Sequence, residues 1–425
     1  MTEPTTPTPT PGTGTGATPG TAAATSGARP LEGLRVIDLA SVIMGPYACQ
    51  ILGDLGADVI KIESPTGDVM RHVHKRDADT IGALALNINR NKRGVRLDLK
   101  RPEGRRAALD LIATADALIT NMRPRALRKL GLTYEDLAAD NPRLVYCNAQ
   151  GFRSDSPAAD YAAYDEVIQA SSGMVDLMRR VTGKPYYIPT TMADKVCGLT
   201  IAYAVLAALL GRERTGGGQH VEVPMADTMF AFTLVEHIGG QVYEPPAGPV
   251  GFPRSLEPGH AAFPTKDGYA CILPYNYRDA EAFFAFVGHP EEIEGFTPEN
   301  FQSKIGELYE LLAPHTDGHT TAEWEAFCSQ HSIPFAPVMN LDHAGEHPYW
   351  SGGHMLDVQQ HPHVGAYRVI GEPVRFSDSS FAVRRPCPEL GEDTESVLTE
   401  IGYTPEQVNA AIQDTDDDGR DRKGR

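Results

Sequence analysis

The first half of the chain repeats one local pattern, in which short, β-branched apolar runs alternate with segments whose apolar residues recur at helical spacing. The runs that read as strands are residues 34–40, 58–63, 94–99, 116–121 and 143–149, and the helical segments between them are residues 47–57, 102–115 and 124–139. A strand, a crossover helix and a second strand form a βαβ unit with parallel strands. The pattern therefore predicts an α/β fold with a Rossmann-like parallel sheet.

The second half divides at a segment rich in proline and glycine. Before it, residues 194–216 form the longest apolar stretch, which predicts a helix buried in the core or at a subunit interface. After it, residues 263–275 read as a hairpin that turns at Lys266, Asp267 and Gly268, and residues 363–377 return to strand character. We expect a large domain over 30–240, rejoined by about 345–412, with a linker and a smaller α+β domain over 241–344.

Both ends of the chain differ in composition from its interior. Residues 1–29 are almost entirely Thr, Pro, Gly and Ala, and residues 413–425 are polar, so both are predicted to be disordered tails. The chain has 425 residues and a net charge of −18, which argues against a nucleic-acid partner. It has six isolated cysteines, no secretory signal and no uncharged membrane-length run. We expect a cytoplasmic protein with no membrane partner.

One segment carries the opposite charge. Twelve Lys or Arg and only four acids lie between Arg90 and Lys129. Many of them fall at predicted strand ends and helix starts, where α/β sheets bind anions, so a nucleotide or coenzyme site is one interpretation. Solvated faces of two surface helices are the other, and charge alone does not choose between them.

Familiar catalytic and metal-binding motifs are missing from the sequence. His72 and His74 form a close pair, as do His361 and His363, but neither pair has a third ligand at a recognised spacing. There is no phosphate-binding Walker loop and no serine nucleophile elbow. We therefore expect no metal, and the nucleophile must come from another residue type.

Several long blocks of sequence, in order, resemble one enzyme family. They include PLEGLRVIDLASVIMGPYACQILGDLGADVIKIE (30–63), NRNKRGVRLDLKRPEGR (89–105), NMRPRALRKLGLTYEDL (121–137) and ADKVCGLTIAYAVLAALLGRERTGGGQHVEV (193–223). These blocks are similar to the class III CoA-transferases, the family of formyl-CoA and carnitine CoA-transferases. The resemblance covers residues 30–232 and is weaker beyond them.

The resemblance implies an intertwined homodimer in which each chain has a large Rossmann-like domain and a smaller one. It also implies CoA transfer from an acyl-CoA donor to a carboxylic acid, through an aspartyl anhydride and an aspartyl-CoA thioester. The matching aspartate is Asp194, just before the long apolar stretch. A carboxylate at a helix start faces free N–H groups, so we expect Asp194 to remain ionised. Helix capping alone is the other interpretation.

Coenzyme A and acyl-CoA are then substrates, and no tightly bound cofactor is expected. Matching the family by position gives these CoA contacts: Ile43, Met44, Arg71, Leu97, Lys100, Asn121, Met122, Arg123, Lys129, Ala162, Ala163, Tyr164 and Asp165. Two positions depart from the formyl-CoA transferase pattern, because Ser64 and Lys129 stand where arginines are expected. The family's glycine-rich loop is matched by residues 248–260, which puts formate and oxalate in doubt as substrates.

The α-methylacyl-CoA racemases share this fold and remain the alternative. They move an α-proton with a histidine that stands immediately before an aspartate, and here that position is Tyr164, before Asp165. A phenol, whose ordinary pKa is about 10, is a poor base at neutral pH. Tyr164 therefore favours transferase over racemase. Arg254, His260, Tyr275, Asn276, Tyr277 and Arg278 are candidate contacts for the acceptor acid, or ordinary surface polarity.

Overall fold

The structure, a computed structural model, describes residues 29–412 except 79 and 354. The predicted tails, apart from Arg29, lie outside the described residues. The centre of the fold is a sheet of six parallel strands in the order β3-β2-β1-β4-β5-β6. This order reverses direction between β1 and β4, as in Rossmann folds. The predicted α/β class and parallel sheet are therefore confirmed.

The elements of this sheet follow the sequence pattern closely. Its strands are β1 (Arg35–Leu39), β2 (Asp58–Glu63), β3 (Lys92–Arg96), β4 (Ala117–Thr120), β5 (Val145–Gln150) and β6 (Gln219–Pro224). Its longer helices are α1 (Met44–Asp54), α3 (Pro102–Ala113), α8 (Met192–Thr215) and α9 (Met225–His237). The shorter ones are η1 (Val69–His72), α2 (Ala83–Ile88), α4 (Pro124–Leu130), α5 (Tyr134–Ala138), α6 (Asp165–Ser171) and α7 (Met174–Thr182).

Helices cover both faces of the six-stranded sheet. Alternate residues of each strand point to opposite faces, so Val36 joins a core with α1 and α8, while Ile37 joins a core with α3, α4 and α5. The second core also takes apolar side chains from α15 (Thr394–Glu400) and α16 (Pro405–Ile412). The C-terminal helices thus pack on the same sheet as the N-terminal half.

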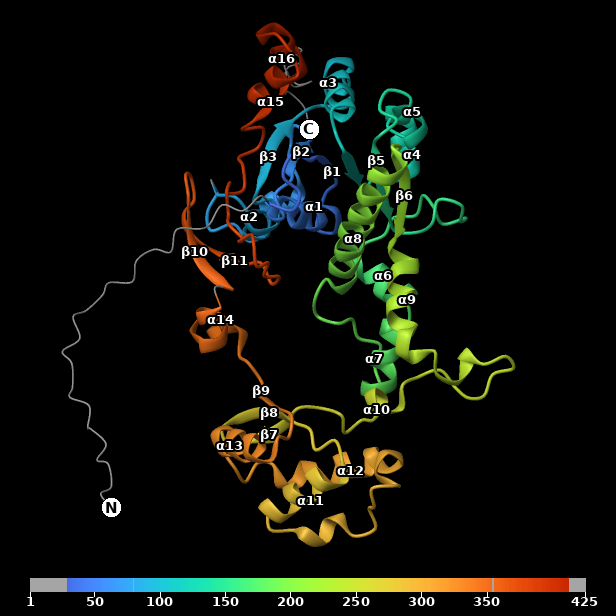
Figure 1. Cartoon of the computed structure of the whole chain (residues 1–425), viewed down its shortest axis with the longest axis vertical. Coiled ribbons are helices and arrows are strands. Elements are labelled where there is room, and N and C mark those ends of the chain that lie inside the picture. Colours follow the sequence, from blue (N-terminus) through green and yellow to red (C-terminus); the bar gives the residue numbers. More distant parts are fainter. Residues whose placement is uncertain (1–28, 79, 354, 413–425) are drawn as a thin grey trace, which may run out of the picture.

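A second sheet lies apart from the first, at the bottom of Figure 1. Its antiparallel strands are β7 (Phe263–Thr265), β8 (Gly268–Ile272) and β9 (Phe335–Pro337). It carries α11 (Tyr277–Phe286), η3 (Pro290–Ile293), η4 (Phe301–Lys304), α12 (Ile305–Leu312), η5 (Ala313–His315) and α13 (Thr321–His331). The predicted hairpin is confirmed, since β7 and β8 pair antiparallel across Lys266 and Asp267. Its core centres on Trp324, which stacks on Phe283 at 5.1 Å between ring centroids.

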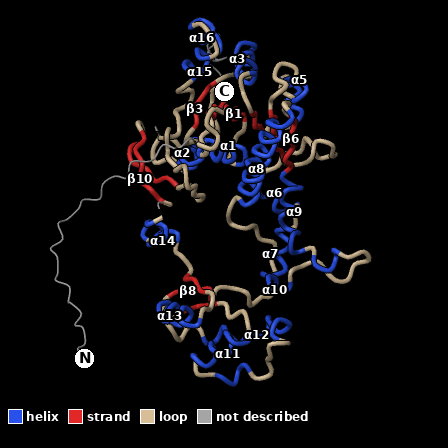
Figure 2. The backbone as a smooth tube through the Cα atoms, in the orientation of Figure 1, coloured by secondary structure: helices blue, strands red, loops and turns tan. Residues whose placement is uncertain are grey.

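Two separate segments join the small sheet to the large one, as Figure 2 shows in tan and blue. The first holds η2 (Gly239–Val242) and α10 (Pro253–Leu256), and the second holds η6 (Leu341–Glu346) and α14 (Pro348–Gly352). The second continues into β10 (Leu356–His361) and β11 (Gly365–Ile370), which pair only with each other. The strand predicted within residues 363–377 therefore forms a hairpin beside the large sheet and does not extend it.

The long helix α8 is only partly enclosed. Cys197, Ile201 and Val205 are buried against the sheet, whereas Leu199 is 51% and Tyr203 64% exposed. By length and composition α8 is the one candidate membrane span among the described residues, but such a helix is weak evidence because core helices pass the same test. Its inner face packs on α1, β5 and β6.

A fully buried ionic network lies under the loop that joins β1 to α1. The Nζ of Lys92 lies 2.8 Å from an Asp38 carboxylate oxygen and donates to the carbonyl of Pro46 at 2.8 Å. The Nζ of Lys61 lies 3.8 Å from the same carboxylate and donates to the carbonyl of Ala40 at 2.9 Å. Burial alone would raise the pKa of Asp38, but the two lysines outweigh it and hold that pKa below its ordinary value.

Buried ion pairs show that part of the basic segment between Arg90 and Lys129 is neither a solvated helix face nor a coenzyme site. Arg90, Lys92 and Arg93 are neither solvated nor free to bind a ligand, because they are buried in ion pairs. Arg90 pairs with Asp54 at 2.8 Å, and Arg93 pairs with Asp58 at 2.7 Å. Arg93 also contacts Glu400 of α15 at 2.6 Å. At these three positions the positive charge stabilises the fold.

Replacing Lys92 with methionine is expected to destabilise the protein strongly. The variant keeps the side-chain volume but leaves the Asp38 carboxylate with only the more distant Lys61. Breaking a buried pair costs about 3–5 kcal/mol, which urea denaturation would measure. The matched control is Arg106→Met, because Arg106 pairs with Asp110 on an exposed helix surface. Equal unfolding midpoints for the two variants would contradict a structural role for the network.

Candidate active site

The loops that follow β1, β4 and β5 meet around a cavity of about 370 Å³. The carboxyl ends of parallel strands share one edge of a sheet, and ligands bind where the strand order reverses. Here the reversal falls between β1 and β4. Ser41 comes after β1, Asn121 after β4 and Gly151 after β5, and all three line the cavity.

Most of the residues predicted from the sequence are brought together in this cavity. Those that line it are Met44, Asn121, Met122, Arg123, Ala162, Ala163, Tyr164 and Asp194. They come from four separate stretches of chain, so their meeting is a result of the fold. Tyr164 is 66% exposed and precedes α6 as its N-cap residue.

The β1–α1 loop is held in a strained shape. Val42 has a φ of 70°, a region that β-branched residues rarely adopt. Its backbone N–H donates to the Asp68 carboxylate at 3.1 Å, and Asp68 in turn lies 3.4 Å from the buried Lys61. Gly45 has no room for a side chain, since a Cβ there would lie 2.2 Å from that of Ala40. The ionic network thus fixes the loop that carries Ile43 and Met44.

Asn121 joins two of the cavity's loops. Its side-chain oxygen accepts from the backbone N–H of Ser41 at 3.0 Å, and its side-chain nitrogen donates to the carbonyl of Ser41 at 2.8 Å. The loop after β4 is therefore tied to the loop after β1. Asn121 therefore helps to fix the position of the two loops that line this side of the cavity.

Two of the predicted contacts are cations beside the cavity: Arg123 is the N-cap residue of α4, and Lys129 lies within that helix. Arg123 lines both the main cavity and an adjoining hollow of about 300 Å³, in which Arg125, Lys129 and Asp160 also lie. Arg123 and Lys129 are exposed, and an Arg123 nitrogen donates to the carbonyl of Asp160 at 3.3 Å. An accessible pair of cations at this edge suits an anionic ligand.

Four of the residues predicted from the sequence lie elsewhere. Ile43 faces a neighbouring cavity, Leu97 is buried in the core, and Lys100 is exposed. Arg71 is buried and pairs with Glu63 at 2.6 Å, and it also donates to the carbonyl of Pro388 at 2.9 Å. Arg71 thereby holds the segment before α15 against the loop after β2.

Asp194 and Asp165 meet at the start of α8. The backbone N–H of Asp194 donates to one Asp165 carboxylate oxygen at 3.0 Å, and the Gln169 side chain donates to the other at 2.6 Å. Gln169 also accepts from the backbone N–H of Ile188 at 2.9 Å. Asp165 is buried, whereas Asp194 is half-buried and faces the cavity.

This arrangement changes the ionisation expected of Asp194. Burial, together with the negative charges of Asp165 and Glu166, raises the pKa of Asp194 to about 7. The expectation that the helix start keeps Asp194 fully ionised is therefore wrong. The physical reason is first the burial of Asp194 and then the charge of Asp165, a second carboxylate that accepts from the N–H at this helix start. The ionised form of Asp194 is therefore less populated at neutral pH than that of an ordinary aspartate.

Comparison with known proteins identifies the family. The sequence profile of CoA-transferase family III matches residues 31–394. The chain belongs to this family.

Relatives of this family align with nearly the whole chain. The succinyl-CoA:glutarate CoA-transferase of Mus musculus is 31% identical, over 88% of this chain and 86% of its own. The formyl-CoA:oxalate CoA-transferase of Escherichia coli O6:H1 is 32% identical, over 90% and 98%. A solved CAIB/BAIF family protein from Brucella suis has a TM-score of 0.76 and 30% identity, over 88% and 99%. These relatives support a CoA-transferase that acts on CoA thioesters.

Sequence reasoning about this family member missed Gln169, whose role appears only when α6 and α8 are placed together. Its spacing of four from Asp165 on one predicted helix was the available signal.

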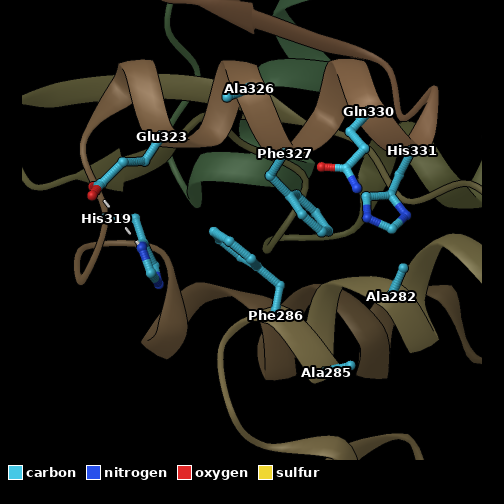
Figure 3. Close-up of a pocket in the computed structure, with 9 residues that line it drawn as sticks. All are labelled: Ala282, Ala285, Phe286, His319, Glu323, Ala326, Phe327, Gln330 and His331. Carbon is cyan, nitrogen blue, oxygen red and sulfur yellow. Dashed lines mark ion pairs between the residues drawn. The ribbon is translucent and has the colours of Figure 1, made fainter.

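A separate hollow lies on α11 and α13, where Phe286 and Phe327 face each other between His319 and His331 (Figure 3). None of the predicted site residues lines it. Among the described residues, no group of three or more metal-ligating side chains is present.

If Asp194 is the attacking nucleophile, as the family resemblance implies, the rate of CoA transfer is expected to rise with pH through a midpoint near pH 7, because only its ionised form can attack. Asp165→Asn removes a neighbouring negative charge but keeps an acceptor oxygen for the Asp194 N–H. Its midpoint should therefore fall, by on the order of one pH unit. Initial rates at saturating substrate, measured from about pH 5.5 to 8.5, give both midpoints.

Glu166→Gln is the matched control, since Glu166 is exposed and contributes least to the raised pKa. Its midpoint should move in the same direction but by less. A midpoint that stays in place or moves upward in Asp165→Asn would contradict the coupling between the two carboxylates.

Proposed function

We propose that the protein transfers CoA from an acyl-CoA donor to a carboxylic acid, with Asp194 as the covalent carrier. The observation that carries this proposal is a half-buried carboxylate of pKa about 7 that lines the same cavity as most of the predicted CoA contacts. Such a carboxylate is partly ionised at neutral pH and is more basic than an ordinary one, so it is a better nucleophile.

The proposed reaction has two balanced halves. The Asp194 carboxylate attacks the thioester carbonyl and expels CoA thiolate, which gives a mixed anhydride. The thiolate then attacks the aspartyl carbonyl, releases the donor acid and leaves an aspartyl-CoA thioester. The acceptor carboxylate attacks that thioester to form a second anhydride, and the thiolate attacks its acyl carbonyl to regenerate Asp194. Each step exchanges one activated acyl bond for another, so no outside energy source is required.

The coenzyme is proposed to follow the cavity's cationic edge. Its phosphates would lie beside Arg123 and Lys129, and its pantetheine arm would pass Ala162, Ala163 and Tyr164 toward Asp194. Two observations support this path. Both cations are exposed, and all of the residues just named line the main cavity except Lys129, which lines the adjoining hollow. Met44, the first residue of α1, lines the same cavity, so the N-terminus of this helix lies beside it.

We also propose that the protein works as an intertwined homodimer in the cytoplasm. Two observations support a dimer: two separate segments join the large and small sheets, and the outer faces of α8 and α9 expose Tyr203, Phe230 and Val235. The six cysteines are free thiols, and five of them are buried, which suits a reducing compartment.

Asp194→Asn keeps the side-chain shape but removes the nucleophile. CoA binding, measured by calorimetry, should survive, while transfer should fall by about three orders of magnitude or more. Hydroxylamine added to the wild type during turnover should convert the activated aspartyl carbonyl to a hydroxamate, which peptide mass spectrometry would locate at Asp194. Arg123→Ala should show the reverse pattern, with weaker CoA binding and with hydroxamate still formed at saturating substrate.

Asp227→Asn is the control for Asp194→Asn, because Asp227 also lies in the first turn of a long helix but is exposed and pairs with Arg153. It should transfer CoA at the wild-type rate. Normal transfer by Asp194→Asn, with no hydroxamate at Asp194 in the wild type, would assign the chemistry to another group.

An α-methylacyl-CoA racemase is the second candidate, because a carboxylate of pKa about 7 also suits an α-proton base. Tyr164 opposes it, since no histidine stands at that position to serve as the second base. Incubation in D2O with a 2-methylacyl-CoA should therefore incorporate negligible deuterium at the α-carbon. Rapid incorporation that is lost in Asp194→Asn would establish the racemase instead.

A further inference from the structure

A second cavity, of about 470 Å³, lies on the other side of the β1–α1 loop from the first. Its walls come from α1, α2, α8 and the segment that follows β11, and most of the side chains that line it are apolar. They include Ile43, Ile51, Leu84, Ile88, Leu199 and Val374. Such a volume with mostly apolar walls is typical of a small-molecule site.

The two cavities adjoin at the proposed nucleophile. Met44 lines the first cavity and its neighbour Ile43 the second, while Asp194 lines the first and its neighbour Lys195 the second. The start of α8 and the loop before α1 therefore separate the first cavity, which is proposed to hold the coenzyme, from the second cavity, whose walls are mostly apolar. An acyl group carried on Asp194 lies at the boundary of the two.

The charged groups around the second cavity disfavour another carboxylate. Arg90 is buried there, but its charge is balanced by Asp54 at 2.8 Å. Lys195 donates to the side-chain oxygen of Thr190 at 2.5 Å. Glu372 lies on the wall and would repel an anion. Thr190 is neutral, so the charge of Lys195 is not balanced by an acid, but Lys195 is exposed and its charge stays solvated. A second carboxylate buried among the apolar side chains would therefore lose its hydration without an unpaired buried cation beside it.

We propose that this cavity holds the acyl chain of the transferred group, and that the substrates are apolar monocarboxylic acids and their CoA thioesters, aliphatic or arylaliphatic. This inference rests on the proposed function, because it assumes that Asp194 carries the acyl group. The side chains of Leu199 and Val374 are apolar and are 51% and 53% exposed. In this proposal the acyl chain of the substrate covers them.

Isotope exchange tests the substrate class with one acid at a time. The full-length protein is incubated with octanoyl-CoA and ¹³C-labelled octanoate, and label entering the thioester is measured by mass spectrometry. The same assay is run with glutaryl-CoA and labelled glutarate. Exchange with octanoate should be faster than with glutarate by about tenfold or more in kcat/KM. Exchange with neither acid, nor with any other in a wider panel, contradicts the proposed function, whereas faster exchange with glutarate contradicts only this inference.

A pair of variants on one helix tests the location. Leu199→Trp fills the cavity and should lower kcat/KM for octanoate by about tenfold, while the dissociation constant of free CoA stays unchanged. Leu210→Trp is the matched control, because Leu210 is 58% exposed on the same helix and lies outside the cavity. It should leave octanoate exchange unchanged. If both variants alter the oligomeric state and neither alters octanoate exchange, the cavity is a subunit contact and the inference is wrong.

Discussion

Two buried lysines, one on β2 and one on the edge strand β3 of the parallel sheet, fix the loop on which both cavities depend. Lys61 of β2 and Lys92 of β3 reach across to Asp38 of β1. Lys61 also donates to the carbonyl of Ala40, which follows β1, and Lys92 donates to the carbonyl of Pro46 in the first turn of α1. Their charges are balanced almost entirely within this network, so the loop is held by fully desolvated, charge-assisted hydrogen bonds. This support explains how Val42 can be kept at a positive φ. It also explains how Ile43 and Met44 come to face different cavities.

At the start of α8, two effects act in opposite directions on the pKa of Asp194: the helix N-terminus lowers it and burial raises it. A helix N-terminus favours an ionised carboxylate, typically by 0.3–1 kcal/mol at an exposed position. At this terminus the buried Asp165 accepts from the Asp194 N–H, so Asp194 experiences the charge of Asp165 together with its own desolvation. Gln169 holds Asp165 in place through its other oxygen. The raised pKa of Asp194 thus follows first from its own burial and then from the charge of the neighbouring Asp165.

The strands and helices of the large sheet could be predicted because each is specified by the pattern of residues within its own short segment of sequence. Runs such as residues 58–63 identify buried strands, and the spacing between them identifies crossover helices, so the carboxyl ends that form the site could be inferred in order. The roles of individual charges were not predictable in the same way. Lys92 and Lys129 look alike in the sequence, but one pairs with Asp38 in the core and the other is exposed at the cavity's edge. The partner of a charge can lie anywhere in the chain, as Glu400 does for Arg93.

The division of the site by one loop has a consequence for specificity. The walls of the first cavity come from strand ends, the loops after them and α4, whereas those of the second come from α1, α2, α8 and residues 370–374. Substitutions in the second set change the space beside the acyl group without touching Arg123, Asn121 or the Asp165–Asp194 contact. A shared coenzyme site can therefore serve relatives named for different acids, such as glutarate and oxalate. In this chain the second set is mostly apolar, and under our proposal it determines which acid is accepted.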